Sequence, residues 1–215
     1  MTNAPLAIVT ARWGSTRLPG KLGKQLGDFP LVWWAWNAAA VAFGPEHVVC
    51  AIPANRENDV LNATLLGMDQ ARSWRPRHVN VFRWQGPEDD VLSRVHDCAH
   101  AYRWHPNSVI VRVTPDDPWK VPEVMRLVAM GERHPVEIGA EAFTLGMLDE
   151  AYETSTEREH LTHAIYALND PPPAPSGTWT IDTQADLDAC RALLREHEHN
   201  IGELAGVLFG GGHPA

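Results

Sequence analysis

A short segment near the start of the chain gathers cations, glycines and hydroxyls, the groups that bind phosphate. Residues 11–21 read ARWGSTRLPGK and include Arg12, Arg17 and Lys21. Glycine lets backbone N–H groups approach an anion, and the three cations offer the positive charge that a triphosphate requires. The segment is not a Walker A loop, because its glycine spacing differs and Leu22 stands where Ser or Thr would bind magnesium. From composition alone, a basic surface turn is the alternative interpretation.

Carboxylates follow two of the expected strands. Asp116 and Asp117 come after the strand expected at 108–113, and Asp182 comes after the strand expected at 178–181. Mg²⁺ prefers oxygen ligands, one or two carboxylates together with substrate phosphates, and an aspartate at each of two strand ends supplies them. The alternative is structural: Asp182 precedes a helix, and the Asp116-Asp117 pair is typical of a turn.

The elements that must position these residues alternate along the chain. Apolar, β-branched runs predict strands, periodic segments predict helices, and Thr183 with Asp186 forms a capping box. The strands are expected at 6–10, 47–52, 78–82, 108–113 and 178–181, and the helices at 31–43, 57–73, 89–104, 122–132, 156–167 and 183–197. This order predicts a single α/β domain over residues 1–209, with a Rossmann-like, mostly parallel sheet, helices on both faces, and a flexible tail at 210–215. Ligands bind such sheets beyond the carboxyl ends of the strands, where the residues above are expected.

Composition limits the classes of partner. The 215 residues carry 18 Lys+Arg and 27 Asp+Glu, a formal net charge of −9, with 44% hydrophobic and 21% charged residues. These values are typical of a soluble globular protein, and the acidic balance argues against a nucleic-acid binder. Cys50, Cys98 and Cys190 lie far apart, and no apolar stretch is long enough to span a bilayer. We therefore expect a cytoplasmic protein with no disulfide, no membrane partner and no nucleic-acid partner.

Five blocks of the sequence, in order, resemble the CMP-sugar synthetases, the cytidylyltransferases that activate sugar acids such as acylneuraminate and 3-deoxy-manno-octulosonate. The blocks are ARWGSTRLPGKL (11–22), GPEDDVLSR (86–94), VRVTPDDP (111–118), STEREHLT (155–162) and IDTQADL (181–187). They are most similar to the branch named for spore coat polysaccharide biosynthesis. The resemblance implies the nucleotide-diphospho-sugar transferase type of fold. It also implies a Mg²⁺-dependent transfer of CMP from CTP to an acidic sugar, or to a related phosphate or phosphonate, with release of pyrophosphate.

The resemblance also implies roles for individual residues. Nucleotide contacts are expected from Ala11, Arg12, Gly14, Ser15, Thr16, Arg17, Lys21, Arg83 and Asp90, and catalytic roles from Arg12, Lys21 and Asp116. Metal ligands are expected at Asp116 and Asp182, with Asp117 as the alternative to Asp116 because Pro115 replaces the family's glycine. Acceptor contacts are expected from Glu141, Arg158 and His160, within or beside a short acceptor and oligomerisation region at about 119–160 of a homodimer.

Other interpretations remain open at the level of sequence. A nucleotide-sugar-dependent glycosyltransferase would also place an aspartate after a strand to hold a metal. A non-catalytic nucleotide-binding protein would share the segment 11–21, called the phosphate loop below. Residues 156–160 are equally typical of a solvated helix start. His96 and His100 share a face of the helix expected at 89–104, but no third ligand is evident, so an exposed face is expected there. Trp13 and Trp84 interrupt or flank the nucleotide motifs and are expected beside the ligand.

Overall fold

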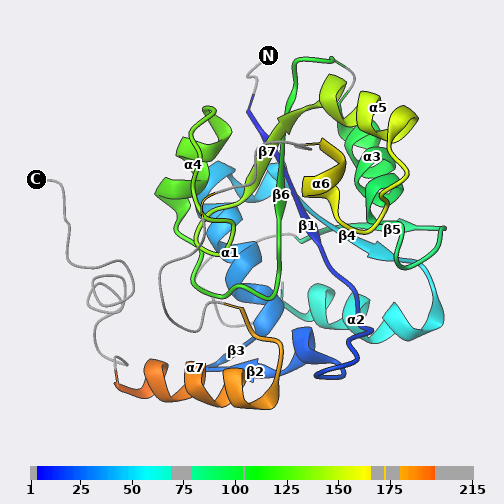
Figure 1. The fold of residues 1–215 in the computed structure, drawn as a ribbon. Coiled ribbons are helices and arrows are strands. Elements are labelled where there is room, and N and C mark those ends of the chain that lie inside the picture. Colours follow the sequence, from blue (N-terminus) through cyan, green and yellow to red (C-terminus); the bar gives the residue numbers. More distant parts are fainter. Residues whose placement is uncertain (1–3, 69–78, 104, 166–171, 173–179, 197–215) are drawn as a thin grey trace, which may run out of the picture.

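A five-stranded, mostly parallel sheet forms the centre of the molecule. The computed structural model describes residues 4–68, 79–103, 105–165, 172 and 180–196. The strand order is β5-β4-β1-β6-β7 (Figure 1). The strands are β1 (Leu6–Thr10), β4 (Val48–Pro53), β5 (Asn80–Trp84), β6 (Val109–Val113) and β7 (Glu141–Thr144), and a small hairpin pairs β2 (Gln25–Leu26) with β3 (Phe29–Pro30). Only β7 runs antiparallel in the large sheet, at its edge beside β6, which confirms the expected fold class.

Helices cover both faces of this sheet, and each face has its own core. Ala7 and Val9 of β1 belong to one core cluster, whereas Leu6 and Ile8 belong to the other, because successive side chains of a strand point to opposite faces. The first cluster is completed by α1 (Leu31–Phe43), α2 (Asp59–Met68), α4 (Pro122–Ala129) and α7 (Gln184–Glu196), and the second by α3 (Val91–Tyr102), α5 (Leu145–Thr154) and α6 (Leu161–Ile165). Three short 3-10 helices are described: η1 (Lys21–Gly23), η2 (Pro45–His47) and η3 (Arg56–Asn58).

Local signals in the sequence explain where key elements begin and end. Helix α1 stops at Gly44, whose φ of 90° is costly for other residues and whose N–H donates to the carbonyl of Ala40. Helix α7 starts in the expected capping box: the backbone N–H of Thr183 donates to Asp186, and the backbone N–H of Asp186 donates to the hydroxyl of Thr183. The three cysteines are buried and free, as the sequence predicts.

Three expectations about the elements differ from the structure. Thr180 and Ile181 do not belong to a strand, and positions 178–179 lie outside the described residues. Instead, Ile181 donates its N–H to the carbonyl of Asp116 at 2.9 Å, so this segment still reaches the strand edge. The helix expected from 156 begins only at Leu161.

The cause of that late start is a side-chain cap. The Glu157 carboxylate accepts the N–H groups of Glu159 and His160, which holds the preceding residues in a turn. Strand β7 and helix α5 are the third difference, since neither is expected from the sequence. The ends of the helices expected at 57–73, 156–167 and 183–197 and the tail at 210–215 lie outside the described residues, and the single-domain assignment of 1–209 stays a prediction.

The topology places one crevice where the strand order reverses. From β1, the chain passes to β4 on one side, whereas β6 lies on the other side of β1 (Figure 1). The loops that leave β1 and β6 therefore diverge at the carboxyl edge of the sheet, which is where open α/β sheets bind ligands. Among the described helices, none combines the length and hydropathy needed to cross a bilayer.

Candidate functional site

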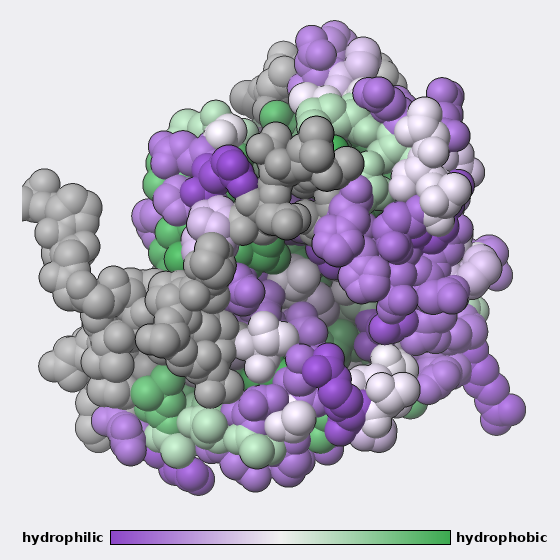
Figure 2. All heavy atoms as spheres, viewed as in Figure 1, coloured by the Kyte–Doolittle hydropathy of each residue, from purple (hydrophilic) through white to green (hydrophobic). Residues whose placement is uncertain are grey.

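A cavity of about 340 Å³ lies at the carboxyl ends of β1 and β6. Its volume falls within the range of small-ligand sites. Figure 2 shows that this face of the molecule is hollowed near the middle of the view and bordered by hydrophilic side chains. The charged residues of its lining are Arg12, Arg17, Lys21, Arg94 and Arg112 against Asp116, Glu159 and Asp182. Five cations against three carboxylates make the lining positive, although the chain as a whole carries −9.

Lys21 lies at the centre of the polar contacts in this cavity. Its Nζ donates to Oδ2 of Asp116 at 2.8 Å, to Oδ1 of Asp182 at 3.0 Å and to the carbonyl of Ile181 at 2.9 Å. Burial acts to lower the pKa of Lys21, but the two carboxylates outweigh it and raise the pKa above its usual value. The lysine is therefore an ammonium at neutral pH, and all three of its N–H donors are used within the chain.

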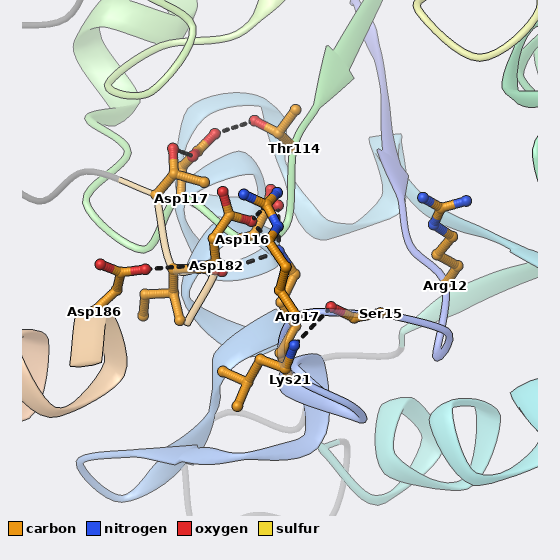
Figure 3. Close-up of polar contacts among 12 residues, drawn as sticks. Arg12, Ser15, Arg17, Lys21, Thr114, Asp116, Asp117, Asp182 and Asp186 are labelled. Atoms are coloured by element: carbon orange, nitrogen blue, oxygen red, sulfur yellow. Dashed lines mark hydrogen bonds and ion pairs between the residues drawn. The ribbon is translucent and has the colours of Figure 1, made fainter. Parts of the chain in front are cut away.

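Asp116 and Asp182 converge on one point from two different segments. Figure 3 shows their side chains and that of Lys21 pointing toward one another. Both carboxylates are about one quarter exposed, at 26% and 27%, so solvent and small ions reach them. Two hard oxygen donors that already share one cation form a ligand set that fits a divalent cation such as Mg²⁺.

The neighbouring Asp117 has a different environment. Its side chain is buried and accepts hydrogen bonds from Thr114, from Thr180 and from the fully buried ammonium of Lys120. Figure 3 shows Asp117 turned away from Asp116 and toward Thr114. Asp117 is absent from the cavity lining, so of the two candidate carboxylates only Asp116 is positioned for a metal or a substrate.

The phosphate loop is held in place from outside the cavity. The backbone N–H of Trp13 donates to Oδ1 of the buried Asn58 at 2.7 Å. The Trp13 indole packs against Gly20 and Gly23, where an added Cβ would lie 2.8 Å from the ring in each case. Gly20 also has a φ of 64°, a conformation that side-chain-bearing residues rarely adopt. The indole thus braces the turn that carries Lys21.

Neither of the two tryptophans expected beside the ligand lines the cavity. Trp13 serves the loop as described above. Trp84 is buried, packs over Gly86 and donates its indole N–H to Asp97 at 2.8 Å. Both side chains pack against the backbone of these motifs outside the cavity, so the expectation that they lie beside the ligand is wrong.

Two further arginines of the lining were not predicted. Arg94 is 1% exposed, and one of its guanidinium N–H groups donates to the carbonyl of Glu88 at 3.1 Å. Burial, reinforced by repulsion from Arg12, lowers the pKa of Arg94 to about 10, so it stays charged at neutral pH. Arg112 forms an ion pair with the buried Glu141. The Nε atoms of both arginines are buried without a hydrogen-bond partner among the described residues, which favours an anion nearby.

Signals for these arginines exist in the sequence. Arg112 interrupts the apolar strand β6, where a charged residue is expensive unless it is paired or functional. Arg94 closes the block GPEDDVLSR that carries part of the resemblance. Both features mark the positions as unusual, although neither says which side of the sheet the guanidinium faces.

Of the predicted site residues, most of the phosphate loop is brought together and several others are not. The cavity lining contains Arg12, Gly14, Ser15, Thr16, Arg17, Lys21, Asp116, His160 and Asp182. Arg83 forms an exposed ion pair with Asp59, and Asp90 caps α3 by accepting from Ser93. Both of these lie outside the lining, as does the fully buried Ala11.

The predicted acceptor residues also separate. Only His160 lines the cavity, together with its neighbour Glu159. Glu141 is buried beneath Arg112 and influences the cavity through that arginine. Arg158 lies over the ring of Tyr152, 5.3 Å from its centroid, and is absent from the lining.

Comparisons with known proteins show the family and the fold. The family described as Cytidylyltransferase matches residues 6–130. The chain is 27% identical to the spore coat polysaccharide biosynthesis protein SpsF of Bacillus subtilis, over 90% of this chain and 88% of that protein. A solved cytidylyltransferase from Leptospira borgpetersenii superimposes with a TM-score of 0.76 at 22% identity, over 96% of this chain and 94% of that one.

A second solved structure, a CMP:2-keto-3-deoxy-manno-octonic acid synthetase complexed with CTP, superimposes with a TM-score of 0.64. Its sequence is 13% identical, over 90% of this chain and 99% of that one. At such identities the two structural likenesses show the fold, and the chemistry has to be argued from the residues of the site.

Proposed function

We propose, since the chain belongs to the cytidylyltransferase family, that it transfers the CMP of CTP to an acidic sugar or a related phosphate or phosphonate acceptor and releases pyrophosphate. The observation that carries the proposal is the Lys21 ammonium held between Asp116 and Asp182 in a cation-lined cavity at the strand switch point. The likeness to SpsF and to a CTP-bound synthetase supports the choice of nucleotide and of acceptor class.

The triphosphate is expected to bind by exchanging partners with the cations of the phosphate loop. Arg12 pairs with Glu159 at 3.3 Å, and Arg17 pairs with Asp182 at 2.9 Å. Both arginines are substantially exposed, and ion pairs at such positions contribute little to stability. The two guanidinium groups can therefore leave their carboxylates for phosphate oxygens at small cost, and a guanidinium binds phosphate in a bidentate manner.

We further propose that Asp116 and Asp182 hold Mg²⁺. When bound, the ion supplies positive charge to the phosphate oxygens and helps to orient them. Lys21 shares the same two carboxylates, and with an ion held there its ammonium would turn to the phosphate chain. The carboxylates thus hold Lys21 in a charged state at the site until nucleotide and metal arrive.

The chemistry is an in-line displacement. An oxygen of the acceptor attacks the α-phosphorus and forms a new P–O bond, while the bond from the α-phosphorus to the bridging oxygen breaks and its electrons leave with pyrophosphate. Where the attacking oxygen is a hydroxyl, its proton passes to solvent. Arg12, Arg17 and Lys21 stabilise the negative charge that develops on the leaving group. His160 lines the same cavity, and we assign to it the contact with the acceptor. Catalysis then consists of positioning and charge stabilisation.

A thermal-shift screen of the four nucleoside triphosphates with Mg²⁺ tests the nucleotide. We expect CTP to raise Tm, and omission of Mg²⁺ to reduce the rise, because ligands that bind only the folded state stabilise it. Absence of a shift with every triphosphate would contradict the proposal.

A pyrophosphate-release assay over a panel of sugar acids, sugar phosphates and phosphonates then tests the reaction. Pyrophosphate formed from CTP only when an acceptor is present supports CMP transfer. In a parallel assay with a nucleotide-sugar in place of CTP, its consumption without pyrophosphate would indicate a glycosyltransferase. CTP binding without turnover over the whole panel would indicate a nucleotide-binding protein.

A further inference from the structure

Two histidines and an aspartate meet beside the C-terminal half of α3, whereas Val91 and Arg94 at its start line the cavity described above. His96 and His100 lie one turn apart in α3, and Asp149 reaches them from α5, which packs beside α3 (Figure 1). Oδ1 of Asp149 lies 2.7 Å from Nε2 of His100 and 3.5 Å from Nε2 of His96. None of the three residues lines the cavity described above.

The hydrogen bonds around His96 fix which of its ring nitrogens carries the proton. Nδ1 of His96 lies 3.0 Å from Oδ1 of Asp97, and the other oxygen of that carboxylate accepts the indole N–H of Trp84. A carboxylate only accepts hydrogen bonds, so Nδ1 of His96 must donate. In the neutral ring, Nε2 then presents a lone pair toward the Asp149 carboxylate oxygen. Two electron-rich atoms aimed at each other are repulsive unless a metal ion lies between them or Nε2 is protonated as well.

We propose that His96, His100 and Asp149 form a binding site for a divalent transition metal, of which Zn²⁺ is the reference case. The site is distinct from the carboxylate pair Asp116 and Asp182, and it does not depend on the proposed nucleotidyl transfer. Two imidazoles with one carboxylate suit Zn²⁺, whereas Mg²⁺ prefers an all-oxygen set.

The spacing agrees with a tetrahedral ion. The three ligand atoms lie within 4.8 Å of one another. Bonds of about 2.0–2.1 Å in a tetrahedron separate the ligand atoms by roughly 3.3 Å, so small side-chain rotations suffice. Three protein ligands leave the fourth position to water. The three side chains are partly exposed, which gives the ion a path from solvent.

The surroundings of the site fit a metal better than a simple hydrogen bond between helices. Asp97 supplies the carboxylate–histidine contact that orients metal-binding imidazoles. The Tyr152 ring stacks on His96 with centroids 3.9 Å apart, which fixes the ring plane. The guanidinium of Arg158 in turn lies over Tyr152, and the carbonyl of Arg158 accepts the N–H of Leu92 in α3. An ion at this site would therefore clamp α5 to α3.

Isothermal titration of the metal-stripped, full-length protein with Zn²⁺ tests the site. Excess Mg²⁺ in the buffer occupies oxygen-only sites such as Asp116 and Asp182. We expect one equivalent of Zn²⁺ per chain, a tetrahedral d–d absorption band when Co²⁺ is used instead, and a rise in Tm of about 5 °C or more at a hundredfold excess over Kd.

Matched variants locate the ion. His100→Gln and Asp149→Asn each remove one ligand while keeping a polar side chain, and we expect each to weaken Zn²⁺ binding at least tenfold. Asp97→Asn alters the orienting contact to His96 and the hydrogen bond from Trp84 without removing a ligand, and we expect it to weaken Zn²⁺ binding by about tenfold. His105→Gln, at an exposed position outside the cluster, is the control with unchanged binding. Binding that all three substitutions leave unchanged, or no binding at micromolar Zn²⁺, would overturn the proposal.

Discussion

Lys21 shows how a single side chain links the two halves of the proposed site. Its ammonium contacts carboxylates from the loop after β6 and from the segment before α7, although Lys21 itself follows β1. Like charges of Asp116 and Asp182 would otherwise repel each other at this short separation. Lys21 therefore holds the two carboxylates together, and in the proposed mechanism it then binds phosphate.

Lys21→Ala should lower turnover a hundredfold or more, equivalent to about 2.7 kcal/mol of transition-state stabilisation, because the leaving pyrophosphate loses a fixed positive charge. Pyrophosphate release under saturating CTP and acceptor measures the effect. Lys24→Ala is the matched control, since Lys24 ends the same turn but does not line the cavity. Wild-type turnover in Lys21→Ala would remove Lys21 from the mechanism.

Asp116→Asn and Asp117→Asn should separate function from stability. Asp116 faces the cavity, so its substitution should abolish Mg²⁺-dependent turnover with a small change in Tm. Asp117 neutralises the fully buried Lys120, and breaking a buried ion pair costs about 3–5 kcal/mol. Asp117→Asn should therefore lower Tm by roughly 6 °C or more. Calorimetry and the pyrophosphate assay on both variants measure this, and a reversed pattern would exchange the two roles.

At the level of single residues, the sequence identifies which side chains can do chemistry better than it identifies where those side chains point. The cations of residues 11–21 and the aspartates Asp116 and Asp182 are recognisable from their types and their positions after strands. Which of two adjacent aspartates faces the cavity depends on Lys120, three residues along the chain, and on Thr180, a distant partner that no local pattern reveals. The nucleotide contact expected from Arg83 fails for a similar reason, because Arg83 pairs with Asp59 of a neighbouring element.

At the level of elements, the turn that carries Lys21 depends on close contact between glycine and an indole. Gly20→Ala should lower the free energy of unfolding by about 2 kcal/mol, because it forces a non-glycine residue to a φ of 64° and places a methyl 2.8 Å from the Trp13 ring. Turnover should fall with it, since Lys21 adjoins the turn. Urea denaturation measures the stability change.

Gly67→Ala is the control for that experiment. Gly67 lies in α2, and an added Cβ would meet nothing within 4 Å. Alanine there should raise stability by about 0.5–1 kcal/mol, since it restricts the unfolded chain and favours the helix. If both glycine substitutions changed stability alike, the Trp13 contact would not be the cause.

The capping box of α7 positions the proposed metal ligand Asp182 as well as the start of the helix. Asp186 accepts the backbone N–H groups of Thr183 and of Asp182, the proposed ligand. Burial alone would raise the pKa of Asp186, but hydrogen bonds from Thr183 and from the Asp182 backbone outweigh it and lower the pKa below its usual value. Its contribution to stability is therefore present above pH 4 and lost as the pH falls further.

Asp186→Ala should cost about 1 kcal/mol at pH 7 and reduce Mg²⁺-dependent turnover, because the Asp182 backbone loses its anchor. The stability difference from wild type should shrink as the pH is lowered below 4. Thermal unfolding across this pH range measures it. Asp188→Ala changes an exposed ion pair of the same helix and should have an effect within 0.5 kcal/mol. A stability difference that stays constant with pH would exclude the carboxylate as the cause.

The elements that the sequence predicts best are those with long, uniform patterns. Strand β1 and helix α1 have the expected bounds because their residues are almost all apolar and pack in the core, β1 in both clusters and α1 in the first. Strand β7 is four residues long, begins with Glu141 and pairs antiparallel at an edge, so neither composition nor alternation marks it. Helix α5 had a usable signal, since Thr144 caps it by accepting the N–H of Met147.

At the level of the whole molecule, two electrostatic fields of opposite sign act on an approaching nucleotide. The net charge of −9 repels CTP, whereas the cavity concentrates five cations against three carboxylates at the strand switch point. Fields from distant surface charges are screened within a Debye length of about 10 Å at 0.1 M salt, but contacts inside a cavity are screened less. Local charge rather than total charge should therefore determine binding.

This balance predicts the direction of a salt effect on CTP binding. If the cavity cations dominate, the KM for CTP should rise several-fold between low and high KCl, while kcat changes less because the bound phosphates exclude most ions. If the surface charge dominates, KM should instead fall as salt screens the repulsion. Steady-state kinetics at fixed Mg²⁺ distinguish the two cases. Arg17→Gln, which removes an exposed cation of the lining, should flatten the dependence, and an unchanged slope in that variant would place the responsible charges outside the cavity.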